Sequence, residues 1–234
     1  SKLVWRTIMD DIKDVMIVNL YSLDETIAKE FLIKYKYPWE ALADIKEYVI
    51  ELGNSLDLNE YDKKGDNVWI HKTAKVYEYS TIIGPCIIGK DTEVRPGAFI
   101  RGSAIIGDNC VVGNSTEIKN VILFNNVQVP HYNYVGDSIL GYKAHMGAGA
   151  ITSNVKADKL NVIIKENGNE IMTNRKKVGA FLGDFAEIGC NSVLNPGTVI
   201  GKNSNVYPLS CVRGVVPSDS IFKNSKNIID KIRR

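Results

Sequence analysis

The chain has 234 residues, 44% of them hydrophobic, which is enough to bury the core of one domain or of one domain with a small appendage. Its formal net charge is +2 with charged residues interspersed, which argues against a groove for nucleic acid or another polyanion. No apolar run approaches the ~20 residues that cross a bilayer, and the first residues show no signal-peptide pattern. We therefore expect a cytoplasmic protein without a membrane-spanning segment.

The four cysteines are widely spaced and form no Cys-x-x-Cys pair. This spacing favours a reducing compartment and argues against both a disulfide framework and a zinc knuckle. Cys86 and Cys110 fall in a small-residue position of the repeat described below. We therefore expect both to be buried core residues.

Residues 1–67 differ from the rest of the chain and predict a small helical region followed by a linker. Ser22–Glu25 has the pattern of a capping box ahead of apolar residues at helical spacing. Pro38 suits the first turn of a second helix, and Gly53 suits its C-terminal stop. The segment Val15–Leu20 is either a short strand or more helix. The helical region is expected to cap the open first coil of the repeats that follow.

From Trp69 onward the hydrophobic residues recur every six positions. The aliphatic residues in strict register are Ile70, Val76, Ile82, Ile88, Val94, Ile100, Ile106, Val112 and Ile118. A small residue often follows four positions later, and a glycine often follows directly. A helix repeats at 3.6 residues and a strand at 2, so neither explains this period. A prism of short parallel strands does, because each unit forms one flat face and one corner, and three units complete a coil.

The sequence therefore predicts a mainly β fold, the left-handed parallel β-helix of hexapeptide repeats, which is an exception to the right-handed crossover rule. Its coils are expected over residues 68–154 and again over 182–216. Residues 155–181 interrupt the period with two aliphatic runs around Asn167–Gly168, which predicts an inserted β-hairpin arm. Residues 217–234 are expected to form a capping tail that is at least partly helical.

The six-residue register slips after Ile118 and again after Val135, and breaks in a local rule are expected at functional sites. The motifs near these slips are Arg95-Pro-Gly97, Glu117-Ile-Lys119, His131-Tyr-Asn-Tyr-Val-Gly-Asp137, and Met146-Gly-Ala-Gly149 with Ile151-Thr-Ser-Asn154. In order and spacing they resemble the C-terminal acetyltransferase domain of the bifunctional N-acetylglucosamine-1-phosphate uridyltransferase/glucosamine-1-phosphate acetyltransferase, over about Val76 to Val212. The helix near Pro38 and the long arm look more like a branch of sugar nucleotidyltransferase-like proteins that carry this β-helix but lack the nucleotidyltransferase domain.

The resemblance implies an acetyl-CoA-dependent N-acetyltransferase acting on an amino-sugar phosphate, with His131 as the general base for the attacking amine. An imidazole, with an ordinary pKa of about 6.5, suits that role at neutral pH. The implied substrate contacts are Arg95, Lys119, Tyr134, Asn154 and Lys177, and the implied acetyl-CoA contacts are Ala148, Gly149, Cys190 and Pro208. Fixed cations suit a phosphate, and peptide N–H groups near Ala148 suit the oxyanion of the tetrahedral intermediate. Members of this family are generally trimers, which implies a homotrimer with its sites between prisms.

Two positions depart from the family pattern. The asparagine ahead of Gly-Ala-Gly is His145 here, and the tyrosine after Thr-x-Asn is Val155. These changes leave open a different sugar, a different acyl donor or lost activity. Glu117 either orients His131 or is a surface glutamate. The histidines do not have the ligand spacing of the zinc enzymes that share this fold, so no protein-ligated metal is expected.

Two alternatives remain open. The chain is either the acetyltransferase above, or a sugar-phosphate-binding or regulatory module that works with a separate nucleotidyltransferase, or a relative of UDP-N-acetylglucosamine pyrophosphorylase with no uridyltransferase activity of its own. Uridyl transfer needs a glycine-rich loop that brings backbone amides to the nucleotide phosphates, and no glycine precedes Gly53. We therefore expect no nucleotide-sugar synthesis by this chain alone.

Overall fold

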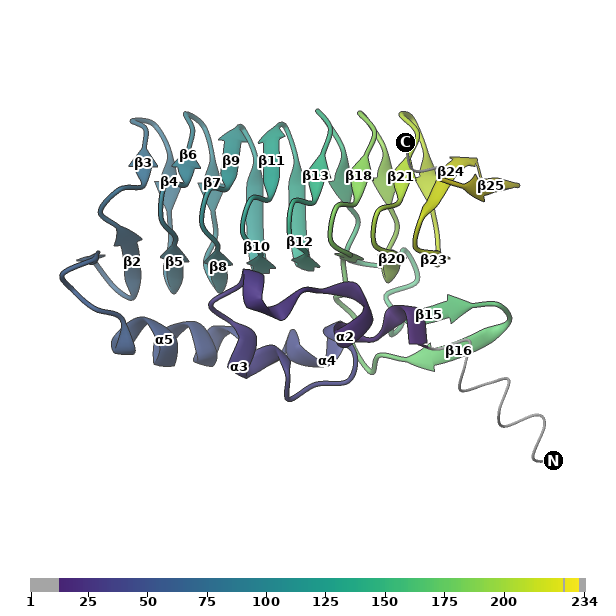
Figure 1. The fold of residues 1–234 in the computed structure, drawn as a ribbon, viewed down its shortest axis with the longest axis horizontal. Coiled ribbons are helices and arrows are strands. Elements are labelled where there is room, and N and C mark those ends of the chain that lie inside the picture. The colour runs from purple at the N-terminus through teal and green to yellow at the C-terminus, as the bar shows by residue number, and fades with distance from the viewer. Residues whose placement is uncertain (1–12, 225, 232–234) are drawn as a thin grey trace.

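Three flat sheets of short strands enclose the core of the protein. The computed structural model describes residues 13–224 and 226–231. Parallel pairing joins each strand to the strand one coil further on, as between Cys86 and Ala104, which are 18 residues apart. Figure 1 shows the resulting prism, with its coils stacked side by side along the long axis. The mainly β, left-handed parallel β-helix that the six-residue period predicts is confirmed.

The three faces of the prism are each built from one strand, or half a strand, per coil. The helix-covered face consists of β2 (Val68–His71), β5 (Cys86–Ile88), β8 (Ala104–Ile106), the second halves of β10 (Glu117–Leu123) and β12 (Tyr134–Leu140), β17 (Ala180–Leu182), β20 (Thr198–Ile200) and β23 (Val215–Val216). The tyrosine face consists of β4 (Thr81–Ile82), β7 (Phe99–Ile100), the first halves of β10 and β12, β14 (Ile151–Thr152), β19 (Val193–Leu194) and β22 (Cys211–Val212). The third face consists of β3 (Lys75–Val76), β6 (Glu93–Val94), β9 (Val111–Asn114), β11 (Gln128–His131), β13 (His145–Met146), β18 (Glu187–Ile188), β21 (Asn205–Val206) and β24 (Ser220–Asn224).

Two corners of the prism carry the predicted site residues. The lysine corner, where Lys119 lies, joins the tyrosine face to the helix-covered face, and β10 and β12 run through it without interruption. The histidine corner, where His131 lies, joins the third face to the tyrosine face. At the lysine corner Asn120 and Asp137 each adopt a φ of 50°, a left-handed conformation that Asn and Asp tolerate better than most residues. The predicted register slips lie at this corner, where each coil is one residue shorter.

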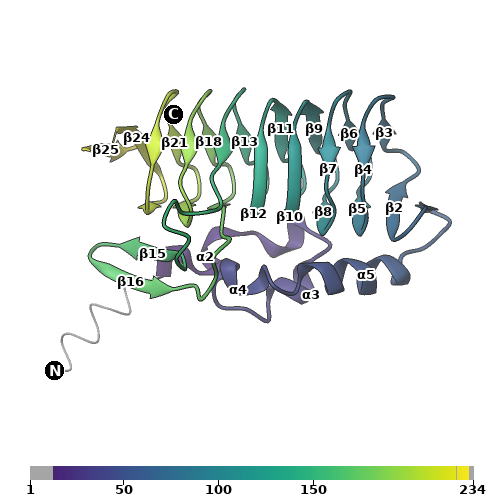
Figure 2. The same cartoon turned by 180° about the vertical axis from the view of Figure 1, so that it is seen from behind.

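Short helices between residues 13 and 55 pack on one face of the prism. They are η1 (Lys13–Val15), α2 (Ile17–Leu20), η2 (Leu23–Glu25), α3 (Lys29–Leu32), α4 (Pro38–Ala41) and α5 (Ile45–Ser55). Figure 2 shows them running beneath β10, β12 and the neighbouring strands. The Trp39 ring lies 5.9 Å from that of Phe181, and the Tyr21 hydroxyl donates to the Ile139 carbonyl at 3.1 Å. None of the helices in the described part of the chain has both the length and the apolar character of a membrane span.

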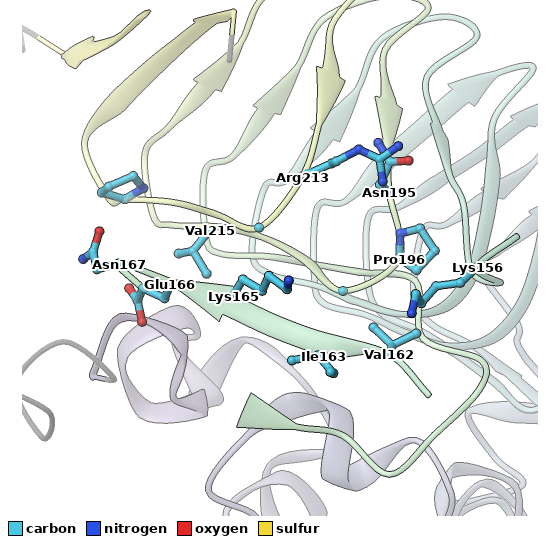
Figure 3. Close-up of a pocket in the computed structure, with 13 residues that line it drawn as sticks. Lys156, Val162, Ile163, Lys165, Glu166, Asn167, Asn195, Pro196, Arg213 and Val215 are labelled. Carbon is cyan, nitrogen blue, oxygen red and sulfur yellow. The ribbon is translucent and has the colours of Figure 1, made fainter. Parts of the chain in front are cut away.

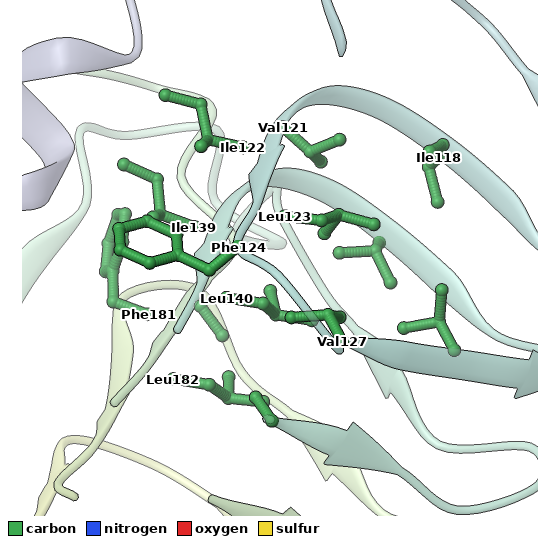
Figure 4. Close-up of a cluster of buried hydrophobic side chains, with 14 of the residues drawn as sticks. Ile118, Val121, Ile122, Leu123, Phe124, Val127, Ile139, Leu140, Phe181 and Leu182 are labelled. Carbon is green, nitrogen blue, oxygen red and sulfur yellow. The ribbon is translucent and has the colours of Figure 1, made fainter. Parts of the chain in front are cut away.

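The helix-covered face has a second apolar layer on its outer side. Successive residues of a strand point to opposite faces, so the middle residue of each short strand points away from the prism interior. These outward residues include Ile87, Ile105, Ile122, Ile139 and Phe181, each at 0% exposure. Figure 4 shows Ile122, Ile139 and Phe181 on the helix side of the sheet, with Leu123 and Leu140 inside the prism. Burying one such side chain contributes roughly 1.5–3 kcal/mol, so the helices share the core of the prism.

The predicted capping box at Ser22–Glu25 is wrong. Ser22 precedes only the single turn η2, and its side chain makes no capping bond there. Its N–H and its hydroxyl instead donate to Asp184 Oδ2 at 2.8 and 2.6 Å. The buried carboxylate of Asp184 is a stronger acceptor than an exposed helix end offers, so Ser22 ties the helices to the prism.

Pro38 begins α4 as predicted, but Gly53 does not end the second helix, because α5 continues past it. A Cβ on Gly53 would lie 2.3 Å from the ring of Trp69. The glycine therefore permits close contact between α5 and the prism rather than marking a stop. The segment Val15–Leu20, for which strand and helix were both open, is helical in η1 and α2.

Both ends of the prism differ from expectation. The helices lie along the prism rather than over its first coil, with α5 in contact with β5, β8 and β10. The edge of the first coil is covered by β1 (Tyr61–Lys64), an antiparallel strand from the predicted linker. At the other end β24 pairs with β25 (Asn227–Asp230), so the described part of the tail forms strands and not a helix. A strand can pair with an open edge, which a helix cannot do. Residues 1–12, 225 and 232–234 lie outside the described residues.

The predicted arm is a β-hairpin that leaves the prism at the lysine corner, between β14 and β17. Its strands β15 (Ile163–Glu166) and β16 (Asn169–Met172) pair antiparallel. Asn167 and Gly168 between them have φ values of 47° and 81°, which fit the tight hairpin turn that an Asn-Gly pair favours. The interruption of the six-residue period thus inserts a projecting element without disturbing the stacking of coils on either side.

Candidate functional site

Four cationic side chains surround one pocket of about 380 Å³ at the lysine corner. Arg101 and Lys119 come from consecutive coils, whereas Arg175 and Lys177 come from the segment that returns from the arm to the prism. A β-bridge between Val155 and Lys177 joins the two limbs of the arm where it meets the prism. The lining includes a single carboxylate, Asp137, so the pocket suits a phosphate, which Arg and Lys bind through charge-assisted hydrogen bonds.

The carboxylate of Asp137 organises this pocket from the inside. The residue is buried, and its Oδ2 lies 3.3 Å from Lys119 Nζ and 2.7 Å from Asn154 Nδ2. Its Oδ1 accepts a hydrogen bond from Asn120 Nδ2 at 2.9 Å, and that amide also donates to the Leu42 carbonyl in the helical region. A buried carboxylate with three donors is fully satisfied and holds those donors in place. Asp137 therefore positions Lys119 and Asn154 at the pocket.

Four of the predicted substrate contacts lie together here. Lys119 and Asn154 meet at Asp137, and the Asn154 amide also donates to the Tyr134 hydroxyl at 3.3 Å. Lys177 lines the same pocket. Burial raises the pKa of Tyr134, with a further contribution from the Asp137 charge, so its hydroxyl stays protonated at neutral pH. A protonated hydroxyl can donate to a ligand oxygen, as a sugar contact requires.

His131 lies at a different corner of the prism. It ends β11, its side chain is exposed, and its ring contacts no partner among the described residues. The Gly149 N–H, in the next turn of the corner, donates to the His131 carbonyl at 3.0 Å. The turns that hold Cys190 and Pro208 stack next in line. The residues implied for acetyl-CoA, Ala148 included, therefore form one column with His131.

One peptide N–H in this column is available to a ligand. The Gly147 N–H donates to the Ile188 carbonyl at 2.7 Å, and the Gly149 N–H donates to the His131 carbonyl at 3.0 Å. The Ala148 N–H between them has no acceptor in the described part of the chain. Backbone N–H groups are obligatory donors, so this one points to water or to a bound oxygen. It is the one N–H of this glycine-rich turn that can serve as an oxyanion donor.

Two predicted residues join neither group. Arg95 lies on the histidine corner two coils before His131, and its Nε donates to Glu93 Oε2 at 3.0 Å. Glu117 does not orient His131, because its Oε1 lies 3.5 Å from Arg101 Nη1. Its other expected role, as a surface glutamate, is nearer to the structure, in which it pairs with an arginine of the lysine-corner pocket.

The two departures from the family pattern lie in different places. His145 is on the third face, where its Nδ1 lies 2.7 Å from Glu187 Oε2, and this hydrogen bond raises the pKa of His145. Val155 lies beside the lysine-corner pocket through its bridge to Lys177. Within one chain, therefore, only the change at Val155 bears directly on that pocket.

Arg101 and Arg175 are the pocket residues that the motifs do not predict. Arg101 lies 18 residues before Lys119, which is the length of a full coil, so counting coils back from the lysine would have found it. Arg175 has no comparable signal, because it lies on the arm, where the period of the prism does not apply.

All four cysteines are free thiols. Cys86 and Cys110 are buried as predicted, and burial raises the pKa of each to about 12, which makes them poor nucleophiles. Cys190 and Cys211 are exposed. Within residues 13–224 and 226–231 no three His, Cys, Asp or Glu side chains converge in a way that could hold a metal ion.

These features define the class of the protein: a hexapeptide-repeat β-helix with a cationic pocket at one corner and a histidine column at the next. The family model described as GMPPB C-terminal domain matches residues 82–178. A bifunctional sugar-1-phosphate nucleotidylyltransferase/acetyltransferase of Sulfurisphaera tokodaii is 30% identical over 228 residues, which cover 88% of this chain and 53% of that protein. A bifunctional protein GlmU of Methanococcus maripaludis is 37% identical over 139 residues, covering 59% of this chain and 34% of that protein. The resemblance to the bifunctional sugar-phosphate enzymes is confirmed, and the chain spans about half the length, or less, of these curated relatives.

Solved structures with the same kind of repeat are more distant in sequence. PerB from Caulobacter crescentus, in complex with CoA and GDP-perosamine, is 17% identical with a TM-score of 0.37, covering 70% of this chain and 56% of that chain. The acetyltransferase domain of PglB from Neisseria gonorrhoeae, in complex with acetyl coenzyme A, is 15% identical with a TM-score of 0.37, covering 77% of this chain and 76% of that chain.

Proposed function

We propose that this chain is a CoA-dependent N-acetyltransferase that acts on an amino-sugar phosphate resembling glucosamine-1-phosphate. The observation that carries the proposal is the convergence of four cations on the lysine-corner pocket, among them Lys119 and Lys177. They suit the phosphate of the substrate, while Asn154 and Tyr134 beside them suit sugar hydroxyls. The related bifunctional proteins include one named for an acetyltransferase activity, which supports the same reading.

The chemistry follows from the histidine column. His131 takes a proton from the substrate amine as the nitrogen attacks the thioester carbonyl of acetyl-CoA. The new N–C bond forms, the Ala148 N–H donates to the oxyanion of the tetrahedral intermediate, and the C–S bond then breaks. The CoA thiolate leaves and receives the proton that His131 took. A column of turns beside His131 gives the cofactor an extended surface along the corner.

We also propose a homotrimer, in which His131 of one copy faces the lysine-corner pocket of the next. Within one prism the two groups lie at different corners, so a single chain does not bring them together. The helices already occupy one face, which leaves the tyrosine face and the third face for packing against other copies.

Three exposed side chains on the histidine corner support this interface. Tyr79, Tyr132 and Leu209 are 82%, 61% and 80% exposed. Each has a left-handed backbone, with φ of 65°, 50° and 58°, at positions where Asn or Gly would be more stable. Strained backbone and exposed apolar surface together have a reason if a second copy covers this corner.

Thiol release from acetyl-CoA, measured with glucosamine-1-phosphate and a panel of amino sugars, tests the activity. His131→Ala is expected to lower kcat by roughly 10²–10⁴-fold with little change in KM for the phosphate substrate, whereas Lys119→Ala is expected to raise that KM. His71→Ala is the matched control, because His71 bonds Thr73 in the first coil. Turnover that survives His131→Ala contradicts the general-base role, and light scattering of the purified chain tests the trimer.

A sugar-phosphate-binding or regulatory module is the second candidate. The observation that favours it is Val155, which replaces a ligand tyrosine of the resembled family beside the pocket. Binding of glucosamine-1-phosphate by calorimetry, without CoA turnover on any amino sugar, would select this candidate over the enzyme.

A further inference from the structure

A second cavity, of about 520 Å³, lies between the arm and the last turns of the lysine corner. Val162 and Ile163 form its wall on the arm, and Pro196 and Val215 form its wall on the prism. Figure 3 shows the strand of the arm running along one side of this space and Arg213 on the other. The volume is in the range of small-molecule sites, and the apolar walls are typical of them. None of the residues predicted from the family motifs lines it.

The cavity is cationic as well as apolar. Lys156, Lys165 and Arg213 line it, against one carboxylate, that of Glu166. The two lysines have exposed carboxylate partners on the arm, at 3.0 and 3.2 Å, in the kind of surface pair that contributes little and exchanges readily. Arg213 is exposed and has no acidic partner among the described residues. The side chains at this cavity are therefore free to turn toward an anion.

Two glycines set the distance between the arm and the prism. Gly197 has a φ of 82°, and a Cβ there would lie 2.8 Å from Val162 Cγ1. Gly214 has a φ of 77°, and a Cβ there would lie 3.0 Å from the Lys165 carbonyl oxygen. The arm thus packs on turns that only glycine allows it to approach so closely. The cavity beside this contact is preformed, which lowers the ordering cost of binding.

We propose that this cavity binds a nucleoside phosphate, with its nucleoside between the apolar walls and its phosphates at Lys165 and Arg213. The heterocycle and ribose bury apolar surface, and arginine binds phosphate oxygens through paired N–H donors. Two sources of this chemistry exist for an enzyme of this kind. One is a sugar nucleotide, and the other is the phosphorylated adenosine of CoA, which applies only if the proposed acetyl transfer holds.

Isothermal titration of the full chain with UDP, GDP, adenosine 3′,5′-bisphosphate and inorganic phosphate tests the site. We expect at least one nucleotide to bind at least tenfold more tightly than inorganic phosphate, and Arg213→Gln to weaken that binding at least tenfold. The preferred nucleotide identifies the source: adenosine 3′,5′-bisphosphate points to CoA, and UDP or GDP points to a sugar nucleotide.

Two variants guard the interpretation. Lys159→Gln removes an exposed lysine of the arm outside the cavity and is expected to leave the Kd within twofold. Lys119→Ala is also expected to leave it unchanged, because Lys119 lies in the other pocket. Binding lost in Lys119→Ala but kept in Arg213→Gln would place the nucleotide at the lysine-corner pocket and overturn the proposal. Nucleotides that bind no better than inorganic phosphate would overturn it too, whatever the outcome for acetyl transfer.

Discussion

Replacing Asp137 with asparagine removes the charge that organises the lysine-corner pocket and little else. Asparagine tolerates the left-handed φ of 50° at this position, so the backbone is not the target. The new amide presents an NH₂ group where a carboxylate oxygen now accepts a bond, either from Asn120 at 2.9 Å or from Asn154 at 2.7 Å. A buried donor left unsatisfied costs ~1–3 kcal/mol, and a lost charge-assisted bond costs ~1.5–3 kcal/mol. Lys119 is 19% exposed and can turn partly to water, which reduces the sum to about 2–4 kcal/mol.

Denaturant unfolding of Asp137→Asn against the parent chain measures this loss in the free energy of unfolding. Asp91→Asn is the matched control, since Asp91 is exposed, has a φ of 56° and has no side-chain partner among the described residues. It is expected to change the free energy by no more than about 0.5 kcal/mol. If the two variants unfold alike, the carboxylate does not hold the pocket. Under the proposed function, Asp137→Asn also raises KM for the phosphate substrate, because Lys119 and Asn154 lose their positions.

Three further predictions concern the rest of the fold. Gly53→Ala should lower the free energy of unfolding by about 1–2 kcal/mol, because overpacking against the buried Trp69 ring outweighs the ~1 kcal/mol gained in helix propensity. Ile105→Ala should cost about 2–4 kcal/mol, because it opens a cavity between α5 and the prism. Glu187→Gln removes the bond that raises the pKa of His145, so its effect depends on pH. A raised pKa stabilises fully below about pH 6.5 and stops doing so above the folded pKa, so denaturant unfolding should show a loss of up to about 1 kcal/mol at pH 5.5 and less at pH 9.

Each of these variants has a counterpart that should behave differently. Asn54→Ala changes an exposed position of the same helix and should not destabilise the chain. Ile83→Ala removes an isoleucine that is 48% exposed and should cost well under half as much as Ile105→Ala. Glu78→Gln, at an exposed position, should show no dependence on pH. A stabilised Gly53→Ala, equal losses at the two isoleucines, or a Glu187→Gln effect that grows with pH would each contradict the packing or charge argument behind it.

The prism is predictable from the sequence because its cause is local and repeated. Every sixth residue points inward, so one aliphatic period specifies the coils before any long-range contact is known. The helix-covered face follows from a second period that the first one hides. Trp69, Ile87 and Ile105 recur every 18 residues, once per coil, and all are buried by the N-terminal helices. A count at the length of a coil would have predicted which face the helices cover.

The site is predictable only in part, for reasons of the same kind. Lys119, Tyr134 and Asn154 follow from motif spacing, and the shortened corners near them are visible as register slips. Their convergence on Asp137 depends on where the corner falls in three dimensions, which spacing alone does not give. The contact between Ser22 and Asp184 joins residues 162 positions apart, and nothing local competes with it for prediction.

The helix α5 changes how the prism can come apart. In a solenoid each coil contacts only its neighbours, so coils can fray one at a time from either end. Because α5 packs across β5, β8 and β10, it acts as a splint over three successive coils. Loss of any one of these coils breaks the contacts of the others with the helix, so they unfold as one cooperative unit. The coils beyond β17 have only the arm and the terminal hairpin beside them, and this end of the solenoid opens first.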